Sequence, residues 1–130
     1  MIKIISFSIR ETEDDKMDCI FCKIVEGTIP SRKVYEDDDI VAFHDIQPQA
    51  PVHLLVIPRK HFASLDAAAP EDAVLLGKMM LVAKQIAHEA GLTADGYRVA
   101  TNIGANAGQI VFHIHLHVIG GEKLAGINAK

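Results

Sequence analysis

The chain has 130 residues, of which 49% are apolar, 23% are charged and none is tryptophan. This length and composition suit one globular domain. Thirteen Lys and Arg residues against 17 Asp and Glu residues give a formal net charge of −4, and the cations form no cluster, which argues against a nucleic-acid polymer as a ligand. No apolar run approaches the roughly 18 residues that a membrane span requires, so we expect a soluble, cytoplasmic protein that does not bind membranes.

The first 16 residues are set apart from the rest of the chain. They have neither the basic start nor the small-residue cleavage site of a signal peptide, and Met17 stands directly before the first orderly segment. We therefore expect residues 1–16 to be a flexible N-terminal extension and residues 17–130 to form the domain. The alternative is that Ile2 to Ile9 add an edge strand.

The first half of the domain predicts a short helix and three strands. Apolar residues at positions 20, 21, 24 and 25 have helical spacing and predict a helix over Cys19–Val25. Two β-rich runs around a polar stretch, Lys33–Glu36 and Ile40–Asp45, predict a hairpin. Val52–Ile57 is bounded by prolines, which suit strand ends, and predicts a third strand.

The second half predicts a long helix followed by two strands. From Pro70 to Ala90 the apolar residues recur three or four positions apart, and Gly91 follows as a stop signal. Tyr97–Asn102 and Ile110–Ile119 predict the fourth and fifth strands. One long helix among five mostly adjacent strands predicts an α+β domain on a five-stranded antiparallel sheet.

Three histidines alternate with apolar residues near the C-terminal end. On a strand, His113, His115 and His117 would share one face at intervals of about 7 Å. The residues facing the core would be Phe112, Ile114, Leu116 and Val118. Such a row indicates either a His₃ metal centre with an open water position or attack on phosphorus by a neutral imidazole. A preceding loop with Gly104 and Gly108 can bring backbone N–H groups close to an anion.

The segment from His113 to Ile119 matches, at every position, the His-φ-His-φ-His-φ-φ motif of the histidine triad (HIT) family, where φ is apolar. Ala42–Pro51 and His53–His61 resemble the Hint branch of that family, the purine nucleoside phosphoramidases, and the similarity runs from about Cys19 to Gly121. The resemblance implies a HIT-like fold that forms a homodimer. It also implies a hydrolase that cleaves the P–N or P–O bond at the α-phosphate of AMP or GMP derivatives.

The resemblance also assigns roles to the histidines. His115 would be the nucleophile and would form a covalent nucleotidyl-histidine that water hydrolyses, with no catalytic metal. His117 would contact the phosphate oxygens; related nucleotidyltransferases have Gln there, so a histidine favours hydrolysis over transfer. His113 completes the triad, and His53 would orient it.

Other positions would bind the nucleotide. Asp45 would accept hydrogen bonds from the ribose hydroxyls, while Asn102, Gly108 and Gln109 would contact ribose or phosphate. The base cleft would be lined by Phe21, Ile24, Ile29, Phe43, His44 and Ile46. Ile110 stands where many members have a Ser or Thr that donates towards the leaving group. This departure keeps open a nucleotide-binding interaction protein with residual catalysis; a dinucleoside polyphosphate hydrolase is a further alternative that the Hint-like segments disfavour.

Both cysteines fall in one CxxC pair, Cys19 and Cys22, which supplies two of the four ligands of tetrahedral zinc. The resemblance adds His61 and His113 as the other two. Such a site has no open position and would therefore be structural. A redox dithiol and two unliganded thiols are the remaining interpretations.

Overall fold

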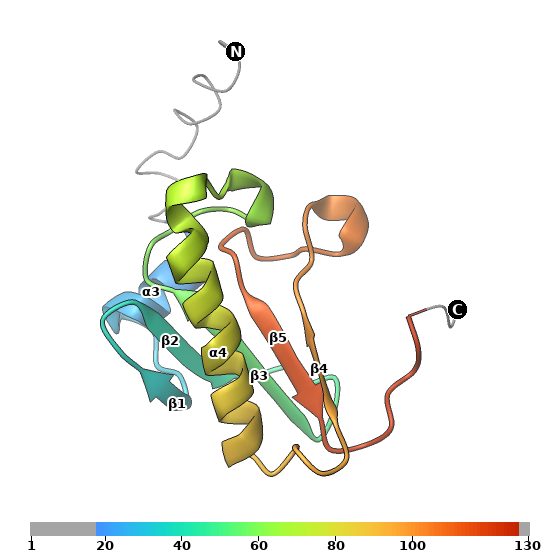
Figure 1. Ribbon diagram of the computed structural model, residues 1–130. Helices are drawn as coiled ribbons and strands as arrows, with labels where there is room; N and C mark the ends of the chain where they lie inside the picture. Colours follow the sequence, from blue (N-terminus) through green and yellow to red (C-terminus); the bar gives the residue numbers. More distant parts are fainter. Residues whose placement is uncertain (1–17, 128–130) are drawn as a thin grey trace.

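The computed structural model describes residues 18–127, so the predicted extension over residues 1–16 lies outside the described residues. A single antiparallel sheet has the strand order β1-β2-β3-β5-β4 (Figure 1). Its strands are β1 Lys33–Glu36, β2 Ile40–His44, β3 Val52–Pro58, β4 Tyr97–Ala100 and β5 Leu116–Gly120. The predicted α+β fold with a five-stranded antiparallel sheet is therefore confirmed, including the first hairpin.

Two helices cover opposite faces of the sheet. The long helix α4, Ala73–Glu89, follows a 3-10 turn at Pro70–Asp72, and the short helix α3 spans Ile20–Glu26. Buried residues of α4, such as Met79 and Ile86, share one core cluster with Leu54 and Val56 of β3. Residues of α3 share a second cluster with the alternate strand residues, such as Leu55. This alternation follows from the two-residue period of a strand.

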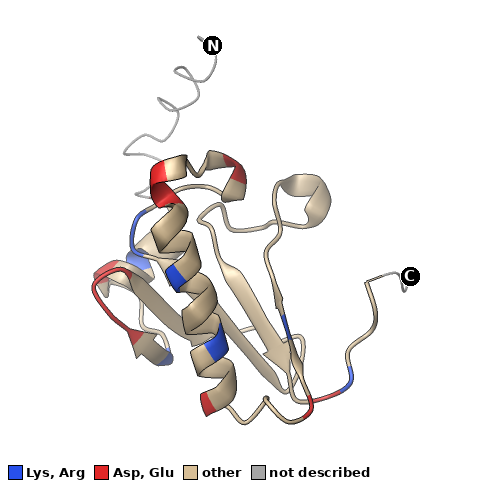
Figure 2. Ribbon diagram, in the orientation of Figure 1, with Lys and Arg blue, Asp and Glu red and all other residues tan. Residues whose placement is uncertain are grey.

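The ends of the elements differ slightly from the predictions. β2 and β4 end one and two residues earlier than expected, β3 extends one residue further, and α3 begins and ends one residue later. The long helix was predicted from Pro70 to Ala90, but α4 begins at Ala73 and ends at Glu89. Among residues 18–127, neither helix combines the length and hydropathy that a transmembrane span requires. Lys and Arg are scattered over several elements rather than gathered on one (Figure 2).

The predicted fifth strand over Ile110–Ile119 is wrong at its start, because β5 begins only at Leu116. Residues 110–115 run beside the loop that follows β3, where the N–H of Ile114 donates to the Phe62 carbonyl at 2.8 Å. Phe112 was expected in the core, yet 49% of its surface is exposed. Ile114, Leu116 and Val118 nevertheless pack in the α4 core cluster, as predicted.

Candidate active site and metal cluster

A cleft of about 600 Å³ lies on the side of the sheet that carries α3. Its walls come from α3, from strands β2, β3 and β5, and from the loops that follow β2 and β4. The structure brings together most of the predicted site residues here: Phe21, Ile24, Ile29, Phe43, His44, Asp45, Ile46, His53, Asn102, Gly108, His115 and His117. Apolar side chains dominate the α3 end, and polar side chains gather at the histidines.

Several further residues line the cleft without having been predicted as nucleotide contacts: Ile20, Pro30, Ser31, Gln47, Gln49, Leu55, Ile110 and Val111. Ile20 could have been found, because it precedes Ile24 by one helical turn. Gln47 and Gln49 lie in the loop that begins at Asp45, and the backbone N–H groups of both make bonds in the site. Pro30 and Ser31 have no sequence signal for this position.

The ring of His115 is held in one orientation by its backbone neighbours. Its Nδ1 lies 2.8 Å from the carbonyl oxygen of His113. Because a carbonyl only accepts, Nδ1 carries the proton and the lone pair is on Nε2. The hydroxyl of Thr101 donates to the His115 carbonyl at 2.7 Å, which fixes the backbone at this point. Burial lowers the pKa of His115, so the ring is neutral near pH 7.

A second pair of histidines forms a directed hydrogen-bond chain. The backbone N–H of Gln49 donates to Nδ1 of His53 at 3.0 Å, so a neutral His53 carries its proton on Nε2. This Nε2 lies 2.9 Å from Nδ1 of His117. His117 therefore accepts through Nδ1 and has its own N–H on Nε2. Burial, together with the nearby His115 and His53, lowers the pKa of His117 to about 4.

Asp45 lies beside this chain. One carboxylate oxygen accepts the backbone N–H of Gln47 at 2.9 Å, and the other lies 3.4 Å from Nε2 of His53. The carboxylate is therefore oriented at the edge of the cleft by the loop that follows β2. It retains acceptor capacity for hydroxyl groups of a ligand.

The side chain of Gln109 does not line the cleft, contrary to its predicted role as a nucleotide contact. It is buried, and its amide nitrogen donates to the carbonyl oxygens of Ala63 at 2.6 Å and Val111 at 3.0 Å. Its amide oxygen accepts the N–H of Gly104 at 2.8 Å. These bonds connect the loop that contains Gly108 to Ala63, so the role of Gln109 is to hold this loop in place.

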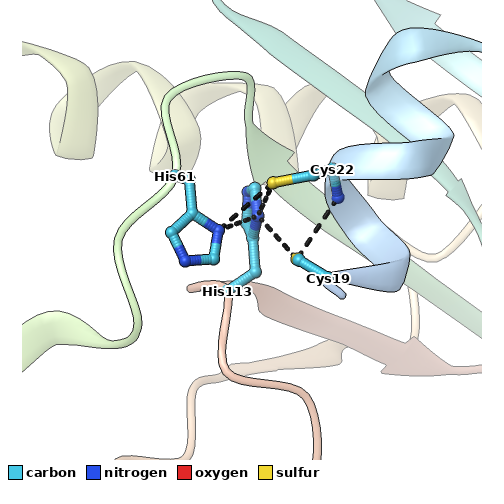
Figure 3. Close-up of side chains that lie close together, drawn as sticks. All are labelled: Cys19, Cys22, His61 and His113. Carbon is cyan, nitrogen blue, oxygen red and sulfur yellow. Dashed lines mark hydrogen bonds between the residues drawn. The ribbon is translucent and has the colours of Figure 1, made fainter. Parts of the chain in front are cut away.

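The structure separates His113 from the other two triad members. Figure 3 shows His113 facing Cys19 and Cys22 at the start of α3, with His61 approaching from the loop after β3. The Sγ of Cys19 lies 3.4 Å from Nδ1 of His113, and the Sγ of Cys22 lies 3.2 Å from Nδ1 of His61. The four donor atoms all lie within 4.8 Å of one another, so this cluster could bind a metal ion.

The cluster has the geometry and chemistry that a metal requires. Tetrahedral zinc, with bonds of about 2.0 Å to nitrogen and about 2.3 Å to sulfur, separates ligand atoms by roughly 3.3 to 3.8 Å. The two imidazole Nδ1 atoms are 3.2 Å apart. His113 donates its Nε2–H to the Pro58 carbonyl at 2.8 Å, which leaves Nδ1 free for a metal and orients the ring.

The thiol of Cys19 is suited to ligation as a thiolate. Burial alone would raise its pKa, but hydrogen bonds with His113, His61 and the backbone N–H of Cys22 lower the pKa to about 5. Neither cysteine forms a disulfide, and both are buried. The cluster therefore offers at least one anionic donor at neutral pH.

A model of the HIT domain matches residues 26–124. This chain belongs to the HIT family. It is 55% identical to protein HitA of Neisseria gonorrhoeae over 102 residues, which are 78% of this chain and 94% of the relative. Among solved structures, it is similar to a HIT family hydrolase from Legionella pneumophila, with a TM-score of 0.83 and 45% identity over 86% of this chain and all of that one.

Another HIT structure bears on the Cys/His cluster. A zinc-bound histidine triad family protein from Mycobacterium smegmatis has 42% identity and a TM-score of 0.73, and the match covers 85% of this chain and 81% of that chain. The HIT fold and the similarity to HIT family hydrolases together support a nucleotide hydrolase.

Proposed function

We propose that this HIT protein hydrolyses purine nucleoside phosphoramidates and related α-phosphate esters through a covalent nucleotidyl-His115 intermediate. The observation that carries the proposal is the bond from His115 Nδ1 to the His113 carbonyl, at 2.8 Å. This bond leaves an unprotonated Nε2 on a neutral ring that lines the cleft. An imidazole in this state is a competent nucleophile.

In the first step, the Nε2 lone pair of His115 attacks the α-phosphorus, and the bond from phosphorus to the leaving nitrogen or oxygen breaks. The leaving group takes that electron pair and a proton. In the second step, water attacks the same phosphorus, loses a proton, and displaces His115 with a nucleoside monophosphate as product. Division into two displacements lowers the barrier of each.

His117 is placed to stabilise charge on the phosphoryl oxygens. Its Nε2 keeps a proton because His53 donates to its Nδ1, so it offers an N–H donor in a partly buried cleft. A donor fixed before the reaction costs no reorganisation as negative charge develops. His53 is thus a positioning residue for His117, in keeping with the orienting role expected for it.

The positions of the histidines favour this mechanism over a shared metal centre. His113 faces the cysteines and is not among the residues that line the cleft. A metal between Asp45, His53 and His117 would need the lone pair on Nε2 of His53. The proton of His53 would then be on Nδ1, where it would face the N–H of Gln49, and two donors cannot bond to each other. The three residues are therefore better suited to orienting the N–H of His117 than to binding a metal.

The remaining cleft residues suit a purine nucleotide. The wall beside α3 is apolar, with Phe21, Ile24 and Phe43 among its members, and can enclose a flat base without selecting strongly between adenine and guanine. Asp45 provides acceptors for ribose hydroxyls. Asn102 and Gly108 line the same cleft and would contact the ribose or the phosphate.

The Cys/His cluster is proposed as a closed structural zinc site with Cys19, Cys22, His61 and His113 as ligands. When bound, zinc would supply a cross-link between α3, the loop after β3 and the segment before β5, rather than an activated water. Two cysteines that form no disulfide fit a reducing compartment, which is in keeping with a cytoplasmic protein.

The decisive experiment is intact-mass measurement after rapid mixing with an adenosine phosphoramidate and quenching under conditions that preserve the adduct. We expect a transient increase equal to one adenylyl group, followed by its loss and the release of AMP. Turnover that depends on added metal and passes through no adduct would overturn the covalent mechanism. AMP binding with turnover barely above the uncatalysed rate would favour the nucleotide-binding protein, since the exposed Ile110 in the cleft offers no hydroxyl donor.

The pH dependence of kcat/KM should reflect the low pKa values of the histidine chain. Burial lowers the pKa of His53, and burial with nearby histidines lowers that of His117 to about 4. Between pH ~6.5 and these lowered values the unfolded chain binds more protons than the folded one, so stability falls as pH decreases through that range. Activity falls when His115 is protonated and loses its attacking lone pair, and burial lowers the pKa of His115 as well. We expect the acidic limb of kcat/KM to lie below pH ~6, with circular dichroism at each pH as the folding control. An acidic limb at pH ~6.5 or above would contradict this assignment.

A homodimer is proposed on the outer side of α4. Three large apolar side chains of this helix are exposed, Val74 at 76%, Met80 at 52% and Leu81 at 66%, and a second copy would cover them. We expect Leu81→Glu to shift the protein from dimer to monomer in sedimentation experiments, because it places a charge in the apolar contact. Lys123→Glu, at an exposed position outside α4, serves as a comparison and should leave the dimer intact; a monomeric wild type would refute the dimer.

A further inference from the structure

Helix α3 takes part in both the cleft and the Cys/His cluster. Cys19 precedes the helix and Cys22 lies in its first turn, and both contribute to the cluster. Phe21 lies between them and is only 6% exposed, and its side chain lines the cleft. A change in how the two cysteines are held therefore acts directly on one wall of the cleft.

Phe21 contacts aromatic rings of both sites. Its ring centroid lies 5.1 Å from that of His115, with the planes at 88°, and 6.0 Å from that of His113. It also meets Phe43 edge-on at 5.6 Å. Edge-to-face contacts at these distances are attractive and directional. The orientation of the His115 ring therefore depends on where α3 holds Phe21.

The backbone provides a second link between the two sites. His113 faces the cysteines with its Nδ1 and donates to Pro58 with its Nε2. Its carbonyl oxygen accepts the Nδ1–H of His115. His113 therefore belongs to the cluster through its ring, and its carbonyl group orients the His115 imidazole by accepting the Nδ1–H.

We propose that Phe21 is a positioning residue that couples metal occupancy of the Cys/His cluster to the orientation of His115 and to nucleotide affinity. A metal that draws Cys19 and Cys22 towards His61 and His113 fixes the start of α3, and Phe21 then packs edge-on against His115. Without the metal only hydrogen bonds join the four donors, and this contact loosens. The inference rests on the proposed function, because nucleotide affinity is one of its two measurable consequences.

The first test measures AMP binding by calorimetry to zinc-loaded protein and to reduced, chelator-treated protein. We expect zinc to tighten AMP binding about 5-fold or more, and AMP to tighten zinc binding by the same factor, because coupling between two sites is reciprocal. In Phe21→Leu we expect zinc still to bind while the coupling factor falls to less than about half of the wild-type value, because only the link through the His113 carbonyl remains. Phe21→Met provides a second apolar replacement if the leucine variant folds poorly.

A matched control comes from the same helix. Val25 packs against the α3 core cluster but does not line the cleft, so Val25→Ala should keep the wild-type coupling factor. A second readout needs no nucleotide: the ¹⁵N NMR signal of the His115 Nδ1–H group, protected by its bond to the His113 carbonyl, should be sharp with zinc and broadened without it. In Phe21→Leu that signal should be broadened in both forms.

The outcomes separate this inference from the proposed function. Equal AMP affinity and an equal His115 signal with and without zinc would overturn the coupling. A wild-type coupling factor in Phe21→Leu would show that Phe21 does not carry the coupling. Absence of both AMP binding and phosphoramidate turnover would instead defeat the proposed function, and the His115 signal would still decide whether the cluster positions this ring.

Discussion

Replacement of His115 with alanine is expected to lower kcat/KM for an adenosine phosphoramidate by at least about 10³-fold, the scale seen when a covalent nucleophile is removed. The side chain is 7% exposed and its Nδ1 bond to the His113 carbonyl leaves Nε2 as the attacking atom. The neighbouring His117 does not replace it through Nδ1, because that atom accepts from His53. The measurement is steady-state release of AMP, with intact mass recorded in parallel.

His88→Ala is the matched control for this prediction. His88 is an exposed histidine in the last turn of α4, outside the residues that line the cleft, so its loss should leave kcat/KM within about 2-fold of the wild type. AMP affinity of His115→Ala should change far less than its turnover. A fall of only a few-fold in turnover, with the adenylyl adduct still present, would mean that another residue is the nucleophile.

Local patterns in the sequence were sufficient to predict the fold. Short β-rich runs with polar residues or prolines beside them marked the strands, and three-to-four spacing marked α4, so an antiparallel sheet of five strands followed. The pairing of β3 with β5, which skips β4, was not predicted. The start of β5 could not be obtained in this way. Residues 110–115 alternate as a strand would, yet contacts from another segment, such as Ile114 N–H to the Phe62 carbonyl, direct their backbone.

The histidine motif correctly indicated that a site is present. It did not indicate that the three histidines belong to two different sites. Regular alternation predicts one row, whereas His113 turns to the cysteines and His115 and His117 line the cleft. That division depends on Cys19 and Cys22, which lie more than 90 positions away in sequence. Gln109 illustrates the same limit, because its partners Ala63 and Gly104 become neighbours only in the folded chain.

The tautomers of the site were also beyond sequence reasoning. A histidine has two nitrogens, and which one carries the proton is set by the hydrogen bond that the other makes. For His53 that partner is the backbone N–H of Gln49, a group that every residue except proline possesses. Only the position of the loop after β2 selects it, and that selection in turn determines the donor that His117 presents to the phosphate.

Removal of metal from the Cys/His cluster is expected to lower the thermal midpoint of unfolding by about 10 °C. The cluster joins residues that are far apart in the chain, Cys22 with His61 and Cys19 with His113, so its ligands converge only in the folded state. A metal at about 100 times its dissociation constant then stabilises the fold by roughly 2.7 kcal/mol. For a domain of this size, that energy corresponds to a shift of about 10 °C.

The measurement is thermal unfolding of reduced wild type and Cys22→Ser, each with zinc and with excess chelator. We expect the chelator to lower the midpoint of the wild type and to leave that of Cys22→Ser unchanged, because the variant lacks one of the four ligands and starts near the metal-free value. Comparison of the two proteins separates the effect of metal loss from the smaller effect of replacing a buried thiol. The thiol effect is the same for the variant with zinc and with chelator. A chelator effect of equal size in the two proteins would place the stabilising metal outside this cluster, and no effect in the wild type would leave the four residues as an unliganded hydrogen-bonded group.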